Sequence, residues 1–424
     1  MFDIEIKELG EDDLFNPLPY FQQYEFWGKF KASHGWTLKK IEISWTFTEE
    51  VSEEIHSCSN IENRHETRFS KKEDVCVLIR SFAKGIFSIA YIPLYPSLPF
   101  ECTDESLFDE AISSEGESLL IENPVTPETQ TIEFASLLNE IGLALKKFLP
   151  SNTICVRFDP SVEFYSPEDR DNFNYGLRLV SFADRLKVTK SKVDIQPPDS
   201  TRVYLTKNED EILRSMKNKW RYNIRLAEKK GVQIEKYNGK DINLSEKLDI
   251  FYDLYKITAA RDGISVHPKA YYKDLLQNSS QNVNTSATQN DKNPHVSLYL
   301  AKHEDDYLGA IMTLFCEDEA VYLYGCSGNE KRNLMPNFLL QWTAMKDAKA
   351  YGCPYYDLYG MPPTDDENHP MHGLYLFKTG FGGFNYHRIG SFDVRLRFIY
   401  RLSSAGESLR AWYHKVFKKK VRGR

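Results

Sequence analysis

The sequence predicts a mixed α/β (α+β) protein with more than one domain, and three observations support this prediction. The length of 424 residues corresponds to two or three domains of about 150 residues each. Strand and helix patterns alternate through the first 190 residues. Between residues 296 and 358, three strand patterns are followed by a helix pattern and a further strand pattern.

The composition is typical of a globular protein, with 41% hydrophobic and 27% charged residues. The net charge of −7 argues against a surface coated with nucleic acid, but it allows a local basic patch. The seven cysteines are scattered and form no C-x-x-C pair, so neither a disulfide framework nor a zinc site is indicated. The start of the chain has no leader pattern, and no apolar run reaches about 18 residues. We therefore predict a cytoplasmic protein that is neither exported nor membrane-spanning.

The first half of the chain contains the elements of one mixed domain. An aromatic helix is predicted at residues 19–31, with Lys31 at its end, and a strand follows at 38–43. The polar residues 44–74 predict a long hairpin insertion, and the acidic residues 101–140 predict a solvated, mobile loop in their early part in preference to a partner site. Two strands, a helix, a strand and a crossing into a second unit then follow at residues 75–80, 86–92, 131–148, 153–158 and 195–201.

Residues 209–230 form the clearest helix pattern of the chain. Apolar residues on one face predict burial, and a basic stripe lies on another face within an arc of about 80°. This stripe consists of Arg214, Lys217, Arg221 and Arg225. Stacked cations with few carboxylate partners favour contact with an anion, because phosphate contacts supply most non-specific affinity for nucleic acid. The pattern alone is equally compatible with a solvated helix face.

A lone lysine marks the least ordinary part of the sequence. Residues 355–359 predict a short buried strand, which a glycine and two prolines end. Lys378 then lies between Phe377 and the glycine-rich residues 380–383, whose backbone can approach another group closely. An ordinary glycine turn with a solvated lysine and a functional lysine are both compatible with this pattern.

The order of elements between residues 296 and 358 resembles the second half of the GNAT acyltransferase fold. In that fold, the loop that opens the helix is usually rich in glycine, so that backbone N–H groups can bind the pyrophosphate of acetyl-CoA. Here residues 329–337 contain no glycine, and Pro336 removes one N–H donor. An acyl-CoA donor is therefore not expected.

Several longer motifs resemble the FemABX family of peptidoglycan bridge aminoacyltransferases, in the family's order and over most of the chain outside the polar insertions. They are Phe26-Trp-Gly-Lys-Phe-Lys31 with Trp36, Gln196-Pro-Pro198, Lys219-Trp-Arg-Tyr-Asn-Ile-Arg-Leu-Ala-Glu-Lys-Lys-Gly231, Ala260-Arg-Asp262, Tyr322-Leu-Tyr-Gly-Cys-Ser327, Arg332-Asn-Leu-Met-Pro-Asn337, Leu340-Gln-Trp342, Tyr356-Asp-Leu-Tyr-Gly360 and Phe377-Lys-Thr-Gly-Phe-Gly-Gly383. No long charged insertion occurs near residues 231–245, so the chain is most similar to the armless FemX type. A Pro-Arg-Gly-Pro motif of the family is replaced by Pro93-Leu-Tyr-Pro96, which lacks the arginine.

The resemblance implies two GNAT-like domains that form a cleft, with no coiled-coil arm. Residues 1–195 with 391–424 would form the precursor-binding side, and residues 196–390 the catalytic side. The implied reaction is tRNA-dependent: an amino acid moves from aminoacyl-tRNA to the side-chain amine of the third residue of a precursor's stem peptide, in UDP-MurNAc-pentapeptide or lipid II. No metal and no cofactor are implied, and we expect a monomer. The basic residues 415–424 offer a further contact for tRNA or for anionic lipid at the membrane, with a solvated tail as the alternative.

The family's functional positions carry over to two groups of residues. For catalysis, Lys378, preceded by Phe377, is expected to stabilise as a cation the oxyanion that develops when the amine attacks the ester. Asp357 could hold the incoming amine, with a structural aspartate at a strand end as the alternative interpretation. The basic stripe of residues 214, 217, 221 and 225 is our candidate tRNA surface.

The second group concerns the precursor. Lys31 and Arg261 are expected to bind its diphosphate, because two cationic side chains match that group. Trp36 belongs to the same motif as Lys31, and Tyr324 is a further candidate for the peptide or the sugar. Two rival functions remain: a GNAT-like N-acyltransferase with a different donor or amine acceptor, and a non-catalytic protein that binds tRNA or the precursor. Retention of the catalytic lysine together with the diphosphate pair argues against the second rival.

Overall fold

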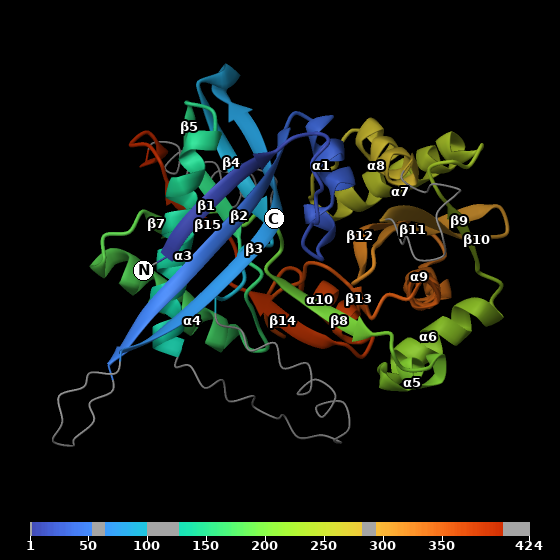
Figure 1. The fold of residues 1–424 in the computed structure, drawn as a ribbon. Helices are drawn as coiled ribbons and strands as arrows, with labels where there is room; N and C mark the ends of the chain where they lie inside the picture. The colour runs from blue at the N-terminus through green and yellow to red at the C-terminus, as the bar shows by residue number, and fades with distance from the viewer. Residues whose placement is uncertain (1, 53–63, 100–126, 282–293, 402–424) are drawn as a thin grey trace.

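Two open sheets with helices packed against them make up the computed structural model, which describes residues 2–52, 64–99, 127–281 and 294–401 (Figure 1). In the described residues the first sheet has seven strands in the order β1-β2-β3-β4-β5-β15-β7, and the second has eight in the order β6-β14-β8-β13-β12-β11-β10-β9. The predicted mixed α/β class is confirmed. The early part of the acidic stretch, residues 282–293 and the basic residues 415–424 lie outside the described residues.

The first sheet is formed by β1 (Phe2–Leu9), β2 (Thr37–Ser52), β3 (Arg64–Phe82), β4 (Phe87–Pro93), β5 (Thr153–Asp159), β7 (Val188–Lys190) and β15 (Phe392–Arg395). The strands β2 and β3 pair along their length and form the predicted long hairpin. Helices α3 (Pro127–Leu145) and α4 (Pro167–Ala183) pack their apolar residues into the core of this sheet. The late strand β15 lies between β5 and β7, so the chain returns to its first sheet near its end.

The contact between α3 and β15 depends on a glycine. A Cβ atom added at Gly142 would lie 2.6–2.8 Å from the side chain of Val394. We therefore expect Gly142→Ala to lower the free energy of unfolding by about 1–3 kcal/mol, through overpacking. Gly373→Ala is the matched control, because a Cβ at this helical glycine meets nothing within 4 Å. Urea unfolding followed by circular dichroism measures both, and equal stability of the two variants would contradict this account of the contact.

The second sheet contains β6 (Glu163–Phe164), β8 (Asp199–Tyr204), β9 (Gln233–Tyr237), β10 (His295–His303), β11 (Asp306–Phe315), β12 (Ala320–Ser327), β13 (Tyr355–Asp357) and β14 (Phe384–Arg388). Helices α6 (Asn218–Lys229) and α9 (Pro336–Tyr351) contribute to one core cluster, and α7 (Leu244–Asp262) and α8 (Lys269–Gln281) to another. The predicted order of three strands, helix and strand is confirmed by β10, β11, β12, α9 and β13. Within the described residues, no helix is long and apolar enough to cross a membrane.

A helix from the start of the chain belongs to the core of the second sheet. The predicted helix at residues 19–31 is a 3-10 turn at Phe21–Gln23 followed by α1 (Glu25–Ala32). Phe30 of α1 is buried, and its ring lies 4.8 Å from that of Tyr271 in α8. The first strands and the second sheet are therefore joined by apolar packing, and Figure 1 shows α1 beside α7 and α8.

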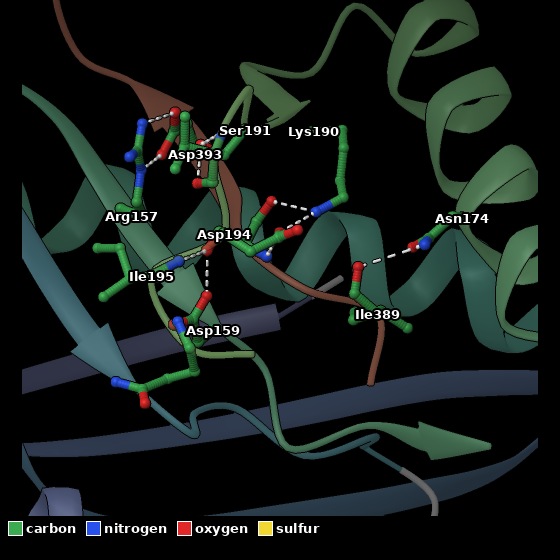
Figure 2. Close-up of polar contacts among 12 residues, drawn as sticks. Arg157, Asp159, Asn174, Lys190, Ser191, Asp194, Ile195, Ile389 and Asp393 are labelled. Carbon is green, nitrogen blue, oxygen red and sulfur yellow. Dashed lines mark hydrogen bonds and ion pairs between the residues drawn. The ribbon is translucent and has the colours of Figure 1, made fainter. Parts of the chain in front are cut away.

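Two crossings of the chain between the sheets lie side by side, and polar contacts fix them (Figure 2). The hydroxyl of Ser391 donates to Asp159, and the same oxygen accepts from the backbone N–H of Ile195 at 3.1 Å. The backbone N–H of Ser391 donates to Asp194 at 2.7 Å. Beside them, Arg157 and Asp393 form a buried two-pronged ion pair at 2.7 and 2.8 Å, shown in Figure 2. A buried pair of this kind fixes the register of β15 against β5.

The prediction of one helix over residues 209–230 is wrong. The chain forms α5 (Glu209–Ser215), breaks at Met216 and Lys217 with extended ψ angles of 151° and 143°, and continues as α6. The break has a tertiary cause. The backbone N–H of Lys217 donates to the carbonyl of Gly380 at 2.9 Å, and a Cβ atom at Gly382 would collide with the backbone of Ser215. The four basic residues are consequently not one continuous helical stripe.

Candidate active site

The parallel pairing of β12 with β13 stops early and leaves backbone carbonyls for another partner. Only Ala320↔Tyr356 and Val321↔Asp357 are paired, although β12 continues to Ser327. Beyond β13 the chain turns, with left-handed φ angles of 50° at Tyr359 and 65° at Gly360. The carbonyls of these two residues therefore do not join the ladder with β12. Carbonyls withdrawn from water require a donor, and these partly buried ones receive it from a lysine.

Lys378 supplies that donor from α10 (His372–Thr379), a helix where the sequence suggested a glycine turn. The side chain is buried, with 4% exposure, and Nζ donates to the carbonyl oxygens of Tyr359 and Gly360, the latter at 2.8 Å. Nζ also lies 5.2 Å from the centre of the Tyr322 ring. The interpretation as a solvated lysine is thus wrong. Burial lowers the pKa of Lys378 to about 7, and the charge of Asp357 opposes that shift.

The glycines around Lys378 serve packing between helices. A Cβ atom at Gly380 would collide with the ring of Trp220 on α6, and one at Gly383 with the carbonyl of Arg202. The indole N–H of Trp220 donates to the carbonyl of Phe377 at 2.9 Å. The Phe377 ring lies in the apolar core, partly buried, and holds the end of α10 there. These glycines allow α10 to approach α6 and β8 closely, which fixes the position of Lys378.

Asp357 fixes the turn whose carbonyl oxygens accept hydrogen bonds from Lys378. Its carboxylate is buried and accepts from the hydroxyl of Ser200 at 2.5 Å, from the backbone N–H of Tyr359 at 2.8 Å, and from the hydroxyl of Tyr386. These contacts engage both carboxylate oxygens. The geometry favours the alternative of a structural aspartate, which acts on Lys378 by fixing the backbone of Tyr359.

A chain of adjoining side chains links this site to the region of Lys31. The hydroxyl of Tyr359 donates to Gln196, whose amide nitrogen donates to the hydroxyl of Tyr91 at 3.0 Å. The ring of Tyr91 lies 6.2 Å from that of Trp36. Since Tyr91 lies in β4 and Trp36 directly precedes β2 of the first sheet, and Tyr359 follows a strand of the second, the candidate residues lie along the junction of the two sheets.

Lys31 lies among aromatic rings beside a second cation that sequence reasoning missed. Its Nζ lies 5.5 Å from the ring centre of Trp27 and 5.8 Å from those of Trp36 and Tyr271. The guanidinium of Arg80 lies 5.3 Å from the same Trp36 ring. Burial lowers the pKa of Lys31 to about 8, and the charge of Arg80 adds to this shift. Lys31 and Arg80 thus share the Trp36 ring, and neither forms an ion pair with a carboxylate among the described residues, so the pair is our candidate anion site.

Comparison with known proteins identifies the family. The sequence profile of the FemAB family matches residues 135–285 and 277–405. The chain belongs to the FemAB family. It is 27% identical over 292 residues to a lipid II:glycine glycyltransferase of Staphylococcus epidermidis, covering 57% of this chain and 68% of the relative. A lipid II:glycine glycyltransferase of Staphylococcus aureus is 27% identical over 300 residues, covering 58% and 69%.

The fold agrees with this membership. A solved structure, the crystal structure of FemX, superposes with a TM-score of 0.60 at 20% identity and covers 91% of this chain and 94% of that one. The predicted mixed α/β fold of the FemX type is thereby confirmed. The FemAB relatives named above are transferases, as the predicted class of enzyme requires.

The remaining precursor candidates of this FemAB chain have different surroundings. Arg261 ends α7, where its guanidinium pairs with Asp262 at 2.9 Å and donates to the carbonyl of Ser327 at 3.3 Å. Tyr324 is partly buried among the rings between α7 and α8, 5.1 Å from Tyr272, and burial raises its pKa. Thus Arg261 lies at the end of β12, while the cation beside Lys31 is Arg80. Arg80 is exposed on β3. Its contact with Trp36 joins two separate segments, so the strand pattern of residues 75–80 could not predict it.

The basic residues at the α5–α6 break are only partly available. The guanidinium of Arg221 donates to the carbonyls of Arg214 and Met216 at 2.8 and 2.6 Å, and so it caps the end of α5. The side chains of Arg214, Lys217 and Arg225 are exposed. An anion could therefore meet three of the four cations, while the fourth is held by backbone carbonyls.

Proposed function

We propose that this FemAB protein is a cytoplasmic, metal-free aminoacyltransferase that moves an amino acid from aminoacyl-tRNA to the side-chain amine of the third residue of a peptidoglycan precursor's stem peptide. The observation that supports this best is the buried Lys378 where the β12–β13 ladder ends, linked by adjoining side chains to the Lys31 and Arg80 pair. The names of the glycyltransferase relatives agree with a lipid-linked precursor as acceptor.

The proposed chemistry is amide formation from an ester. The amine nitrogen attacks the ester carbonyl, a C–N bond forms, the C–O bond to the tRNA ribose breaks, and the amine proton passes to the ribose oxygen. Lys378 would stabilise the oxyanion of the tetrahedral intermediate as a cation. Because its pKa is about 7, a large fraction of the side chain is protonated at neutral pH. The carbonyls of Tyr359 and Gly360 orient Nζ, and Asp357 supports them.

We further propose the division of labour that the resemblance implies. Residues 1–195 with 391–424 would form the side that binds the precursor, and residues 196–390 the catalytic side, with the substrates between them. The position of β15 in the first sheet agrees with this division, whereas α1 and β6, from the first range, belong to the core and the edge of the second sheet. Lys31 and Arg261 would hold the diphosphate, with Arg80 and Trp36 beside Lys31, while Tyr324 would contact the peptide or the sugar.

The tRNA would approach the exposed cations of the α5–α6 region. We expect Arg214→Ala combined with Arg225→Ala to weaken tRNA binding. The slope of the logarithm of the affinity against the logarithm of the salt concentration should become shallower by roughly one for each phosphate that is no longer bound. Lys256→Ala combined with Lys269→Ala is the control, because both lysines already pair with aspartates at 2.7 and 2.5 Å. Filter binding at several salt concentrations measures the slopes. If the Arg214 and Arg225 double variant has the same slope as the wild type, the tRNA binds to another surface.

The reaction itself is tested with a labelled amino acid on a charged tRNA pool. The acceptors are UDP-linked pentapeptide precursor and its lipid-linked form, and acetyl-CoA is offered as a rival donor in a separate reaction. We expect RNase-sensitive labelling of an acceptor and none from acetyl-CoA. Transfer from acetyl-CoA alone would favour the rival N-acyltransferase, and binding of precursor without any transfer would favour a non-catalytic protein.

A further inference from the structure

One end of the first sheet combines exposed apolar side chains with cations, and we propose that it docks on an anionic membrane surface. This tip surface consists of Ile86, at the β3–β4 turn, and of Arg397, Phe398, Ile399 and Arg401, after β15. Figure 1 shows both segments at the same end of the sheet, the turn above β3 and the red segment beside β5. The docking surface stands on its own geometry, and its link to the acceptor rests on the proposed function.

The apolar part of the tip surface is exposed. Ile86 is 69% exposed, Phe398 77% and Ile399 39%. These three side chains line one hollow of about 490 Å³, together with Arg397 and residues of the loop before β5. Apolar groups that gather from distant parts of the chain around one hollow mark an interaction surface, whereas apolar residues scattered singly do not.

The charge of the tip surface is positive although the chain as a whole carries −7. The guanidinium of Arg401 lies 5.5 Å from the ring of Phe398. Arg401 also lines a neighbouring hollow of about 640 Å³ with Leu179 and Phe182 of α4, which are 51% and 86% exposed. Among the residues that the structure describes, neither hollow is lined by a carboxylate. Apolar side chains interleaved with arginines suit the interface of a bilayer that contains anionic lipid.

Other occupants fit this charge less well. A second copy in a symmetric dimer would oppose the same arginines to one another without carboxylates between them. Residues 402–424, which follow Arg401, contain seven Lys or Arg and one Glu, so they would add positive charge to a positive surface. An anionic lipid surface matches both the apolar and the cationic parts of the tip.

The tip surface leads directly to the anion site of Lys31 and Arg80. On β3, the guanidinium of Arg80 lies 5.9 Å from the ring of Phe82, which stacks at 5.7 Å on Phe87, next to Ile86 in the sequence. The other neighbour of Arg80 is Trp36, which contacts Lys31. A molecule with its apolar end in the bilayer and its diphosphate at the surface would therefore meet Lys31 and Arg80.

Vesicle flotation of the full chain tests the docking surface without any need for activity. Vesicles contain phosphatidylcholine alone or equal parts of phosphatidylcholine and phosphatidylglycerol. We expect the wild type to float with the anionic vesicles, and Ile86→Glu combined with Phe398→Glu to lower binding at least about tenfold, because two apolar anchors are removed. Arg397→Ala should weaken binding to anionic vesicles roughly fivefold and should not change binding to phosphatidylcholine vesicles. The matched control is Leu14→Glu with Ile242→Glu, two exposed apolar residues elsewhere, which should bind as the wild type does.

The double variant Ile86→Glu with Phe398→Glu is called the tip variant. The proposal is overturned if the wild type does not float with anionic vesicles, or if the tip variant floats to the same extent as the wild type. Loss of self-association in the tip variant, without vesicle binding by the wild type, would identify a second copy as the occupant and also overturn it. Transfer assays separate this outcome from the proposed function. The tip variant should transfer to the water-soluble UDP-linked acceptor at the wild-type rate, which also shows that it is folded. Its transfer rate to precursor embedded in vesicles should fall at least about tenfold. Absence of transfer by the wild type to either acceptor would refute the proposed function and leave the flotation result valid.

Discussion

Lys378→Met is expected to lower the single-turnover rate of aminoacyl transfer by at least about 100-fold, with precursor affinity unchanged. The physical reason is the loss of a preorganised cation at the position where the oxyanion develops, which is typically worth about 2.7–4 kcal/mol for one donor in a site shielded from water. Methionine keeps most of the side-chain volume. The carbonyls of Tyr359 and Gly360 lose their donor, so a cost of about 1–3 kcal/mol in stability is also expected.

Lys349→Met is the matched control for this experiment. Lys349 also donates to a backbone carbonyl, that of Leu205 at 2.8 Å, but it lies on α9 and is not part of the candidate site. Rapid quenching with labelled aminoacyl-tRNA measures the rates, and calorimetric titration measures precursor affinity. A Lys378→Met enzyme that transfers at the wild-type rate would remove Lys378 from the mechanism, whatever its effect on stability.

The second large effect is expected at the anion site. Lys31→Ala combined with Arg80→Ala should weaken binding of the UDP-linked precursor at least about 100-fold, because each hydrogen bond to a charged group contributes about 1.5–3 kcal/mol. Wild-type affinity should also fall as the pH rises through about 8, where Lys31 loses its proton. Arg80 stays charged throughout, so the single variant Lys31→Ala should lose this pH dependence.

The control uses lysines of the same β2–β3 hairpin that already have carboxylate partners. Lys39 pairs with Glu8 at 2.6 Å, and Lys72 with Glu42 at 2.7 Å. Lys39→Ala with Lys72→Ala should leave the titration curve unchanged. Wild-type affinity in the Lys31 and Arg80 double variant would show that the diphosphate binds elsewhere, with Arg261 as the next position to test.

Local patterns in the sequence were sufficient for the elements whose cause is local. The order of β10, β11, β12, α9 and β13 follows from apolar periodicity interrupted by turn residues, and it was predicted correctly. The long β2–β3 hairpin followed in the same way from a polar insertion between two strand patterns. The identity of the family came from motifs spread along the chain, and the match to the FemAB family confirms it.

Features that depend on tertiary contacts could not be predicted from local sequence patterns. The break between α5 and α6 depends on the contact of Lys217 with Gly380, which lie far apart in the chain. The burial of Lys378 depends on the left-handed turn at Tyr359 and Gly360 after β13, and an isolated lysine before glycines does not reveal it. Arg80 was missed because its partner, Trp36, lies on another segment. In each case the decisive group comes from a neighbouring element.

The pH dependence of single-turnover transfer, compared between the wild type and Lys378→Arg, tests the central claim most directly. Both enzymes share the titration of the attacking amine, so the ratio of their rates isolates residue 378. Because Lys378 has a pKa of about 7 and arginine remains charged, a cationic role predicts that the wild-type rate falls relative to the variant as the pH rises from 6 to 9. A ratio that is flat or rises over this range would show that the charge of Lys378 does not stabilise the transition state.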